Sequence, residues 1–348
     1  MKRSIIAVSV AAALALPMTA QAAPKIYGKL FMTVEQLEKD NGGTTADEDF
    51  VRLVSNDSRF GVKGEDELTA TLSAVYQIEW EVQGDSAGDT TDMKQRNRFI
   101  GLKHQDFGTL KLGAYDTYLK QAQGKADFFN EVTGDMKFVI AGENRVSNVV
   151  GYESPKVLGG LAVNVMTQTQ DTKDNKENAA DDTNPKAAGQ NGSSASIVYD
   201  NSDLGLYLAV AMDANMYDTT AVYGKRASDN LRAVAAYKLG DLTLAGVYNV
   251  SKAATGSSDN EEAGYNVGAS YKLGDQVLKA QWGTAERDEA TTVPADVQER
   301  TMWSVGVDHF FTTKTRALAF YTVKEEDKPA DNNDYEETIF GLGIEHNF

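Results

Sequence analysis

Three carboxylates lie in the middle of the segment from Tyr115 to Ala141, and arginines lie in the strand-like sequence on either side of it. The acids are Asp127, Glu131 and Asp135; the arginines are Arg96 and Arg98 before the segment and Arg145 after it. The segment is too long for a turn and too interrupted for a strand, and long connections of this kind are often functional. We predict a loop folded into the mouth of a β-barrel, its acids facing a basic wall across a narrow aqueous pore. A solvated surface loop is the alternative.

Opposed cations and anions at a constriction would create a transverse electric field where the dielectric constant is below that of bulk water. A small polar solute can align with such a field, while the loop limits solute size and the ring charges set the ion preference. Catalysis would need an activated nucleophile and usually a base. The histidines, His104, His309 and His346, each lie at a predicted strand end and are too scattered for a triad. We expect no enzyme activity, no cofactor and no metal.

The first 22 residues have the features of a secretory signal peptide. Lys2 and Arg3 precede an apolar run from Ile5 to Leu16, and Ala20-Gln21-Ala22 fits a small-x-small cleavage site. The apolar run is shorter than the ~20 residues that a membrane-spanning helix needs. We predict cleavage after Ala22, which leaves residues 23–348 as the mature chain.

The chain is strongly acidic and contains no cysteine. Its net charge of −17 becomes −19 when the two cations Lys2 and Arg3 are removed. This balance argues against nucleic acid or an anionic membrane surface as a partner, and it predicts cation enrichment near any opening. Because no disulfide can support an exported chain of this size, its stability must come from a large closed structure.

Alternation with a period of two is the dominant pattern from Ile26 to the end of the chain. It is clearest from Leu72 to Val82 and returns at Leu204–Val210 and Tyr265–Tyr271. The apolar faces alternate with small or hydrated residues that would pack a core poorly, and no helical stretch could cover them. A sheet of this kind suits lipid on one face and water on the other. A soluble β-sandwich binding protein is the alternative.

The connections between the predicted strands alternate in length. Short ones, such as Leu239-Gly-Asp-Leu and Leu273-Gly-Asp-Gln, have tight-turn residues, whereas Asp171 to Gly192 is long and polar. Another short turn is predicted at Lys63–Glu67, with the third strand starting near Glu67. The pattern predicts an all-β fold: a transmembrane antiparallel β-barrel of about sixteen strands, with short periplasmic turns and long extracellular loops. The third long loop, residues 116–141, would fold into the pore.

The final strand ends at Phe348 and must hydrogen-bond the first strand if the barrel is to have no free edge. This terminus is one of seven short motifs that occur in order along the mature chain. They are Ile26-Tyr-Gly-Lys29, Ser58-Arg-Phe-Gly-Val-Lys-Gly64, Arg98-Phe-Ile-Gly-Leu-Lys103, Phe107-Gly-Thr-Leu-Lys-Leu-Gly113, Tyr152-Glu-Ser-Pro155, Gly159-Gly-Leu161 and the terminal Phe348. Through them the chain resembles the general diffusion porins of Gram-negative outer membranes, especially the neisserial and related proteobacterial porins.

The resemblance implies a homotrimer in the outer membrane, in contact with lipid and lipopolysaccharide, with the third loop inside each pore. It also implies that the β-barrel assembly machinery recognises Phe348. Family members set a basic wall cluster against acids on the loop. Matched residue by residue, the wall cluster is Lys29, Arg59, Arg96 and Arg145, and the loop pair is Asp127 and Glu131. We add Arg98, which would share a face with Arg96 by period two, and Asp135 on the loop.

The expected function is passive diffusion of small hydrophilic solutes and ions, with a weak preference for cations. A substrate-selective porin for saccharides or anions is the alternative. A sugar pore would need an aromatic ladder in the lumen. Tyr115, Tyr118, Phe128 and Phe129 could supply one, although aromatic residues at barrel rims usually belong to the membrane-interface girdles.

Overall fold

The computed structural model describes residues 23–42, 46–85, 93–169, 192–218, 226–254, 261–287, 299–327 and 334–348. The predicted signal peptide and nearly all of the predicted loop from Asp171 to Gly192 lie outside these ranges. No helix among the described residues is long and apolar enough to cross a membrane. The described residues form 17 strands and two short helices: β1 (Lys25–Asp40), β2 (Glu48–Ser55), β3 (Arg59–Thr69), β4 (Leu72–Val82), β5 (Met93–His104), β6 (Gly108–Asp116), α2 (Tyr118–Gln121), η1 (Met136–Phe138), β7 (Arg145–Glu153), β8 (Leu161–Gln168), β9 (Ser193–Asn201), β10 (Leu206–Asp218), β11 (Arg226–Leu239), β12 (Leu242–Ala253), β13 (Glu261–Leu273), β14 (Gln276–Arg287), β15 (Glu299–Phe310), β16 (Thr315–Asp327) and β17 (Tyr335–Asn347).

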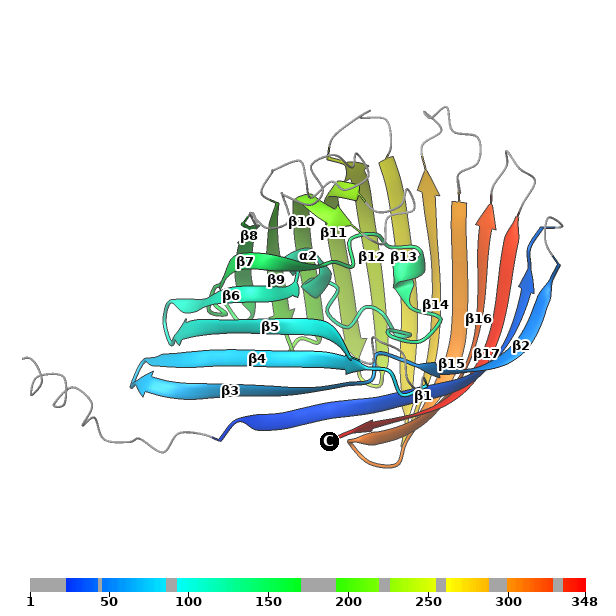
Figure 1. Ribbon diagram of the computed structural model, residues 1–348, viewed down its shortest axis with the longest axis horizontal. Coiled ribbons are helices and arrows are strands. Elements are labelled where there is room, and N and C mark those ends of the chain that lie inside the picture. The colour runs from blue at the N-terminus through cyan, green and yellow to red at the C-terminus, as the bar shows by residue number, and fades with distance from the viewer. Residues whose placement is uncertain are drawn as a thin grey trace, which may run out of the picture.

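The strands form one closed antiparallel ring (Figure 1). The seam lies between the ends of the chain, where β1 pairs with β17 from Lys29 opposite Asn347 to Asp40 opposite Glu336. Beyond this register, Gly28 and Phe348 exchange two backbone hydrogen bonds of 3.3 and 3.0 Å. The predicted pairing of the last residue with the first strand is therefore confirmed, and the closure leaves no free edge at this point of the sheet.

The second barrel strand is interrupted, which explains why 17 strands form a barrel of sixteen. β1 pairs with β2 through its second half and with β3 through its first half. Between β2 and β3, Asp57 has a left-handed backbone with φ of 50°. The neighbouring Ser58 hydroxyl accepts the Phe31 N–H at 2.9 Å, so that β1 remains bonded across the break. The sequence-based count of about sixteen strands is confirmed.

Side-chain exposure follows the predicted alternation on the outside of the barrel. In β12 and β13, Leu244, Tyr248, Tyr265 and Val267 are exposed, while Asn266 between the last two is buried. The inner face differs from the prediction in one region, where it is apolar rather than hydrated. That region comprises Ala209, Ala211, Val234, Ala245, Val247 and Ala285, all of them buried inside the barrel.

Short turns lie at the rim that carries the C-terminus. Gly240 and Gly274, with φ near +60°, make the Gly-Asp turns that the sequence predicted. The predicted turn at Lys63–Glu67 is wrong, because β3 continues through it to Thr69 and β4 begins at Leu72. Glu65 pairs across the sheet with Val75, so this charged run is strand and not turn.

Candidate functional site

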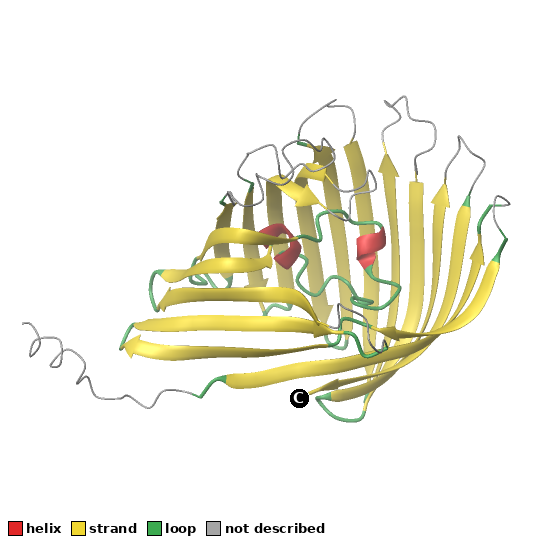
Figure 2. Cartoon of the chain, in the orientation of Figure 1, coloured by secondary structure: helices red, strands yellow, loops and turns green. Residues whose placement is uncertain are grey.

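The segment between β6 and β7, residues 117–144, lies inside the ring of strands, and we call it the constriction loop (Figure 2). Thr117 caps α2 by accepting the Lys120 N–H, and Asp135 caps η1 by accepting the Lys137 N–H. These caps satisfy donors that a short helix leaves without partners. The loop therefore has a defined fold of its own rather than the form of a solvated surface loop.

The loop rests on the apolar region of the inner wall. Leu119, Met136 and Ile140 are almost completely buried in a cluster with wall residues such as Val247 and Ala285. Glycines in the strands allow the loop backbone to come close: a Cβ on Gly264 would lie 2.3 Å from the Val139 carbonyl oxygen. Burial of apolar side chains is favourable at about 25 cal/mol per Å², so this contact holds the loop against β10 to β15.

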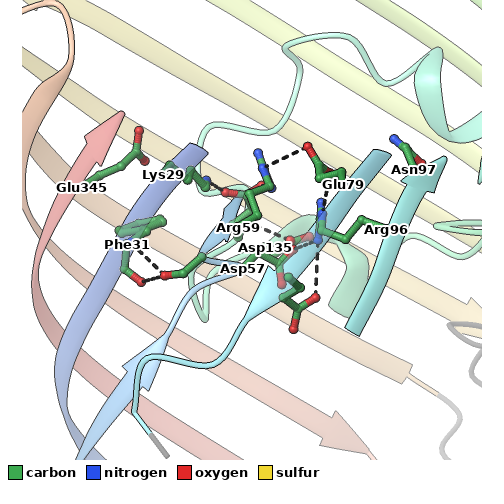
Figure 3. Close-up of polar contacts among 12 residues, drawn as sticks. Lys29, Phe31, Asp57, Arg59, Glu79, Arg96, Asn97, Asp135 and Glu345 are labelled. Atoms are coloured by element: carbon green, nitrogen blue, oxygen red, sulfur yellow. Dashed lines mark hydrogen bonds and ion pairs between the residues drawn. The ribbon is translucent and has the colours of Figure 1, made fainter. Parts of the chain in front are cut away.

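Across the lumen from this contact, the wall formed by β1, β3, β4 and β5 carries a charged cluster (Figure 3). Arg96 on β5 donates to Glu79 at 2.8 Å and forms ion pairs with Asp57 at 3.1 Å and Glu81 at 3.5 Å. Arg59 on β3 also lies 3.8 Å from Glu79. The predicted wall cations Arg59 and Arg96 are thus brought together, with wall carboxylates between them.

Glu131 is the loop acid that reaches this cluster. Its carboxylate accepts from Arg59 Nη1 at 2.6 Å and forms an ion pair with Lys29 Nζ. The backbone of Glu131 has φ of 74°, a left-handed conformation that is uncommon for a residue with a side chain. The predicted opposition of loop acid and wall cation is therefore present for Glu131, Lys29 and Arg59.

The other two predicted loop acids serve the loop itself. The Asp127 carboxylate accepts the Phe129 N–H at 2.9 Å and the Met136 N–H at 3.0 Å. Asp135 accepts the Glu131 N–H at 3.0 Å in addition to capping η1, and it pairs with Lys137 at 3.4 Å. Burial, and then the neighbouring Asp135 carboxylate, raises the pKa of Asp127 well above its usual value. The structure does not set Asp127 against Lys29, Arg59 or Arg96, contrary to the prediction, because its oxygens bind loop amides.

Arg98 does not share a face with Arg96. β4 and β5 pair Ile78 with Arg98 but Trp80 with Gln95, so β5 contains one extra residue between them. Such a bulge reverses the alternation of side chains beyond it. Arg98 therefore lies opposite Ile78, which is 44% exposed on the outer face. The prediction that Arg98 lines the pore is wrong.

Arg145 lies at the root of the constriction loop, apart from the Arg59 and Arg96 cluster. Its guanidinium forms an ion pair with Asp116 at 3.0 Å and donates to the Asn97 side chain at 2.9 Å. Asn97 directly follows Arg96 in β5. The fourth predicted cation is thus adjacent to the wall cluster through Asn97 but binds the start of the loop.

The sequence reading missed a second attachment of the loop tip. Glu35 on β1 is fully buried; it accepts Thr133 Oγ1 at 2.9 Å and pairs with Arg52 at 2.8 Å. Glu35 lies on the same face of β1 as Lys29 by period two, so its position inside the barrel could have been predicted from the sequence. Asp57 carried no such signal, since its position depends on the break between β2 and β3.

A cavity of about 420 Å³ opens beside the loop tip. Charges of both signs line it: Asp57, Glu131 and Asp135 are acidic, while Lys137, Arg300 and Lys324 are basic. Arg300 and Lys324 both lie over the Phe138 ring, with their charged groups 5.4 and 5.3 Å from the ring centroid. The passage beside the loop is therefore lined by charged side chains.

Comparison with known proteins finds relatives that share this closed barrel. The family model described as Gram-negative porin matches residues 7–329. The chain belongs to the Gram-negative porin family. It is therefore a channel protein of the outer membrane and not an enzyme.

Relatives of this porin match all or part of its length. The major outer membrane protein P.IB of Neisseria sicca is 25% identical over 372 aligned residues, which cover all of both chains. The P.IB protein of Neisseria gonorrhoeae is 30% identical over 167 residues, or 46% of each chain. The solved anion-selective porin from Comamonas acidovorans has a TM-score of 0.73 at 20% identity and covers 94% of this chain and 99% of its own. OmpF of Salmonella typhi, solved with daunomycin, has a TM-score of 0.68 at 16% identity. Both structures share the fold with this porin.

We expect the Asp127→Asn variant of this porin to keep its barrel but to lose order in the constriction loop. Each carboxylate oxygen of Asp127 accepts one backbone N–H, and a side-chain amide has only one oxygen. One buried donor would lose its partner, at a cost of about 1–3 kcal/mol. Single-channel recording should show greater open-channel current noise. The exposed turn variant Asp106→Asn is the control, and equal noise in the two variants would contradict the assigned role of Asp127.

Proposed function

We propose that this porin is a passive diffusion channel for small hydrophilic solutes and ions, with a weak preference for cations. The narrowest part lies beside the tip of the constriction loop, where the tip meets the wall that carries Lys29, Arg59 and Arg96. The observation that carries the proposal is the Glu131 carboxylate bound by Lys29 and Arg59. It joins opposite charges from the loop and the wall in one section of the lumen.

The preference for cations follows from the carboxylates around these wall cations. Glu131 pairs with both Lys29 and Arg59, and Arg96 pairs with Asp57, Glu79 and Glu81, so that four carboxylates accompany three cations. At the rim with the long connections, a cavity of about 460 Å³ is lined mainly by carboxylates, including Asp40, Glu299, Glu325 and Glu336. A mouth of this charge raises the local concentration of cations.

The saccharide alternative has little support in the placement of the aromatic residues. Tyr115, Tyr118 and Phe129 are each no more than 2% exposed. The two tyrosines form a cluster with Val149 and Met166, and Phe129 packs with Phe31 and Phe320. Rings that are buried in this way cannot stack against a passing sugar. An anion pore is the second candidate, and the observation that favours it is the presence of Lys29, Arg59 and Arg96 on one wall of the lumen.

The assembly that we propose is a homotrimer embedded in outer-membrane lipid and lipopolysaccharide. The exposed apolar residues on the outside of the barrel, such as Leu244 and Val267, provide the surface for lipid and neighbouring subunits. We also infer that Phe348 serves as the signal for the β-barrel assembly machinery. Its backbone closes the seam with Gly28, and its side chain remains 47% exposed.

The test of this function is the reversal potential of the purified protein in a planar bilayer under a salt gradient. We expect discrete conductance steps and a reversal potential displaced modestly toward the cation equilibrium potential. A clear displacement in the anion direction would overturn the cation preference. An absence of conductance would overturn the channel function itself.

A further inference from the structure

Arg232 on β11 is a wall arginine that lies behind the constriction loop instead of in the open lumen. Its side chain is 0% exposed and is among the largest fully buried side chains of the described residues. A buried guanidinium is costly unless hydrogen bonds and a counter-charge satisfy it. The partners of Arg232 therefore indicate what it does.

The guanidinium of Arg232 binds both legs of the constriction loop. On the return leg, Nη2 donates to the Ala141 carbonyl at 2.7 Å and Nη1 donates to the Glu143 carboxylate at 2.7 Å. On the outgoing leg, Nη1 also contacts the Leu119 carbonyl at 3.4 Å. The loop leaves the wall at Asp116 and returns at Arg145, so one side chain joins its two ends.

The wall fixes the orientation of this guanidinium. Asn249 on the adjacent strand β12 accepts the Nε–H at 3.1 Å. A planar guanidinium with several directed donors is suited to hold a fixed geometry of this kind, and its charge-assisted hydrogen bonds are strong. Lys120, on the outgoing leg, has its Nζ 3.9 Å from the Glu143 carboxylate, which therefore has a second cationic partner.

The backbone of the return leg is shaped for this contact. Gly142 has φ of +89°, a left-handed conformation that favours glycine. A Cβ at this position would lie 2.6 Å from the Leu119 side chain and 3.5 Å from Arg232 Nη2. The two legs therefore approach each other closely at the point where Arg232 binds them.

We propose that Arg232 is the positioning residue of the constriction loop and thereby sets how far the loop tip reaches across the pore. This inference rests on the proposed channel function. The other hydrogen bonds between the loop and this wall, made by Ser194, Tyr207 and Gln281, join neutral groups, and charge-assisted bonds are about twice as strong. The rest of the contact is apolar and has no preferred direction. The ion pairs at the tip are more accessible, since Arg59 and Arg52 are 22% and 34% exposed and are screened by salt.

The experiment uses the full-length protein with the double substitution Arg232→Met and Glu143→Gln. Replacing both partners by neutral groups of similar size avoids leaving one buried charge unpaired. Because the chain contains no cysteine, Lys125→Cys on the exposed part of the loop accepts a single nitroxide spin label. The matched control is Arg316→Met with Glu345→Gln, a wall pair joined at 2.6 Å that contacts no loop carbonyl.

We expect the label to become markedly more mobile in the Arg232 and Glu143 variant, with a several-fold increase in the variance of the open-channel current. The control pair should leave label mobility unchanged. Arg232→Lys, which keeps the charge but loses the several directed N–H donors of the guanidinium, should give an intermediate label mobility. A folded variant with wild-type label mobility and current noise would overturn the proposal.

Two further arms keep the test decisive. If the double variant does not fold, Asn249→Ala removes only the acceptor that orients the guanidinium, and it should give a smaller increase in label mobility; unchanged mobility would again overturn the proposal. The spin-label measurement does not depend on conduction. If the wild-type protein carries no ions, the proposed function fails, while label mobility still reports whether Arg232 anchors the loop.

Discussion

The Glu131→Gln variant should prefer anions, reversing the selectivity proposed for the native channel. Glu131 is the carboxylate that Lys29 and Arg59 both contact at the edge of the constriction. Glutamine keeps the length of the side chain and one acceptor oxygen but removes the charge. At an effective dielectric constant of about 20, a unit charge changes the energy of an ion about 8 Å away by about 2 kcal/mol.

That change acts in opposite directions on cations and anions, so we expect at least a several-fold fall in the cation-to-anion permeability ratio. The measurement is the reversal potential in a low-salt gradient, because the Debye length is about 10 Å at 0.1 M and shortens as salt rises. The matched control is Glu65→Gln. Glu65 lies on the same strand as Arg59, nearer the short-turn rim, and forms an exposed pair with Lys103 at 2.9 Å. If the two variants shift the reversal potential equally, Glu131 does not control the constriction.

The Arg96→Ala variant should show the opposite effect and become strongly cation-preferring. Arg96 forms ion pairs with Asp57, Glu79 and Glu81. Its removal leaves these carboxylates with less compensation, although Arg59 still lies 3.8 Å from Glu79. We expect a several-fold rise in the cation-to-anion permeability ratio. Conductance should change little, because the Arg96 side chain is packed against the wall and only 11% exposed.

Arg98→Ala is the control for this experiment. It removes the same charge two residues farther along β5, but the bulge places Arg98 on the outer face of the barrel. Its reversal potential should match that of the wild-type channel. Unchanged selectivity in Arg96→Ala would remove Arg96 from the constriction, and a shift in Arg98→Ala would place the bulge elsewhere.

Much of the candidate site was predictable in kind but not in detail. The loop acids and the wall arginines were found because charged residues in and beside a long connection stand out from an alternating background. The individual role of each charged residue could not be predicted from the sequence. Asp127 and Glu131 are four residues apart and chemically similar, yet Asp127 binds the Phe129 and Met136 amides while Glu131 reaches the wall. Only the fold of the loop separates them.

The contacts of Arg232 with the loop, and the apolar wall beneath the loop, show a second kind of feature that could not be predicted from the sequence. Ala245 and Val247 read as weakly apolar residues on a face expected to be wet, because the sequence does not show that residues from 119 to 141 pack against them. Arg232 was an ordinary arginine in a strand. Its role depends on carbonyl groups of Leu119 and Ala141, which are common to all residues and leave no trace in the sequence.

The alternating wall, the number of barrel strands, the closure at Phe348 and the segment that enters the lumen can all be read from the sequence alone. These features are local: a period of two, a tight turn or a long connection can each be read from neighbouring residues. Which charged residues contact one another depends on the three-dimensional fold. One extra residue in β5 turned Arg98 outward, a break at Asp57 brought an acid to Arg96, and Glu131 met Arg59 across 72 positions of the chain. Contacts of that kind depend on register and on the path of the backbone, which side-chain pattern alone does not specify.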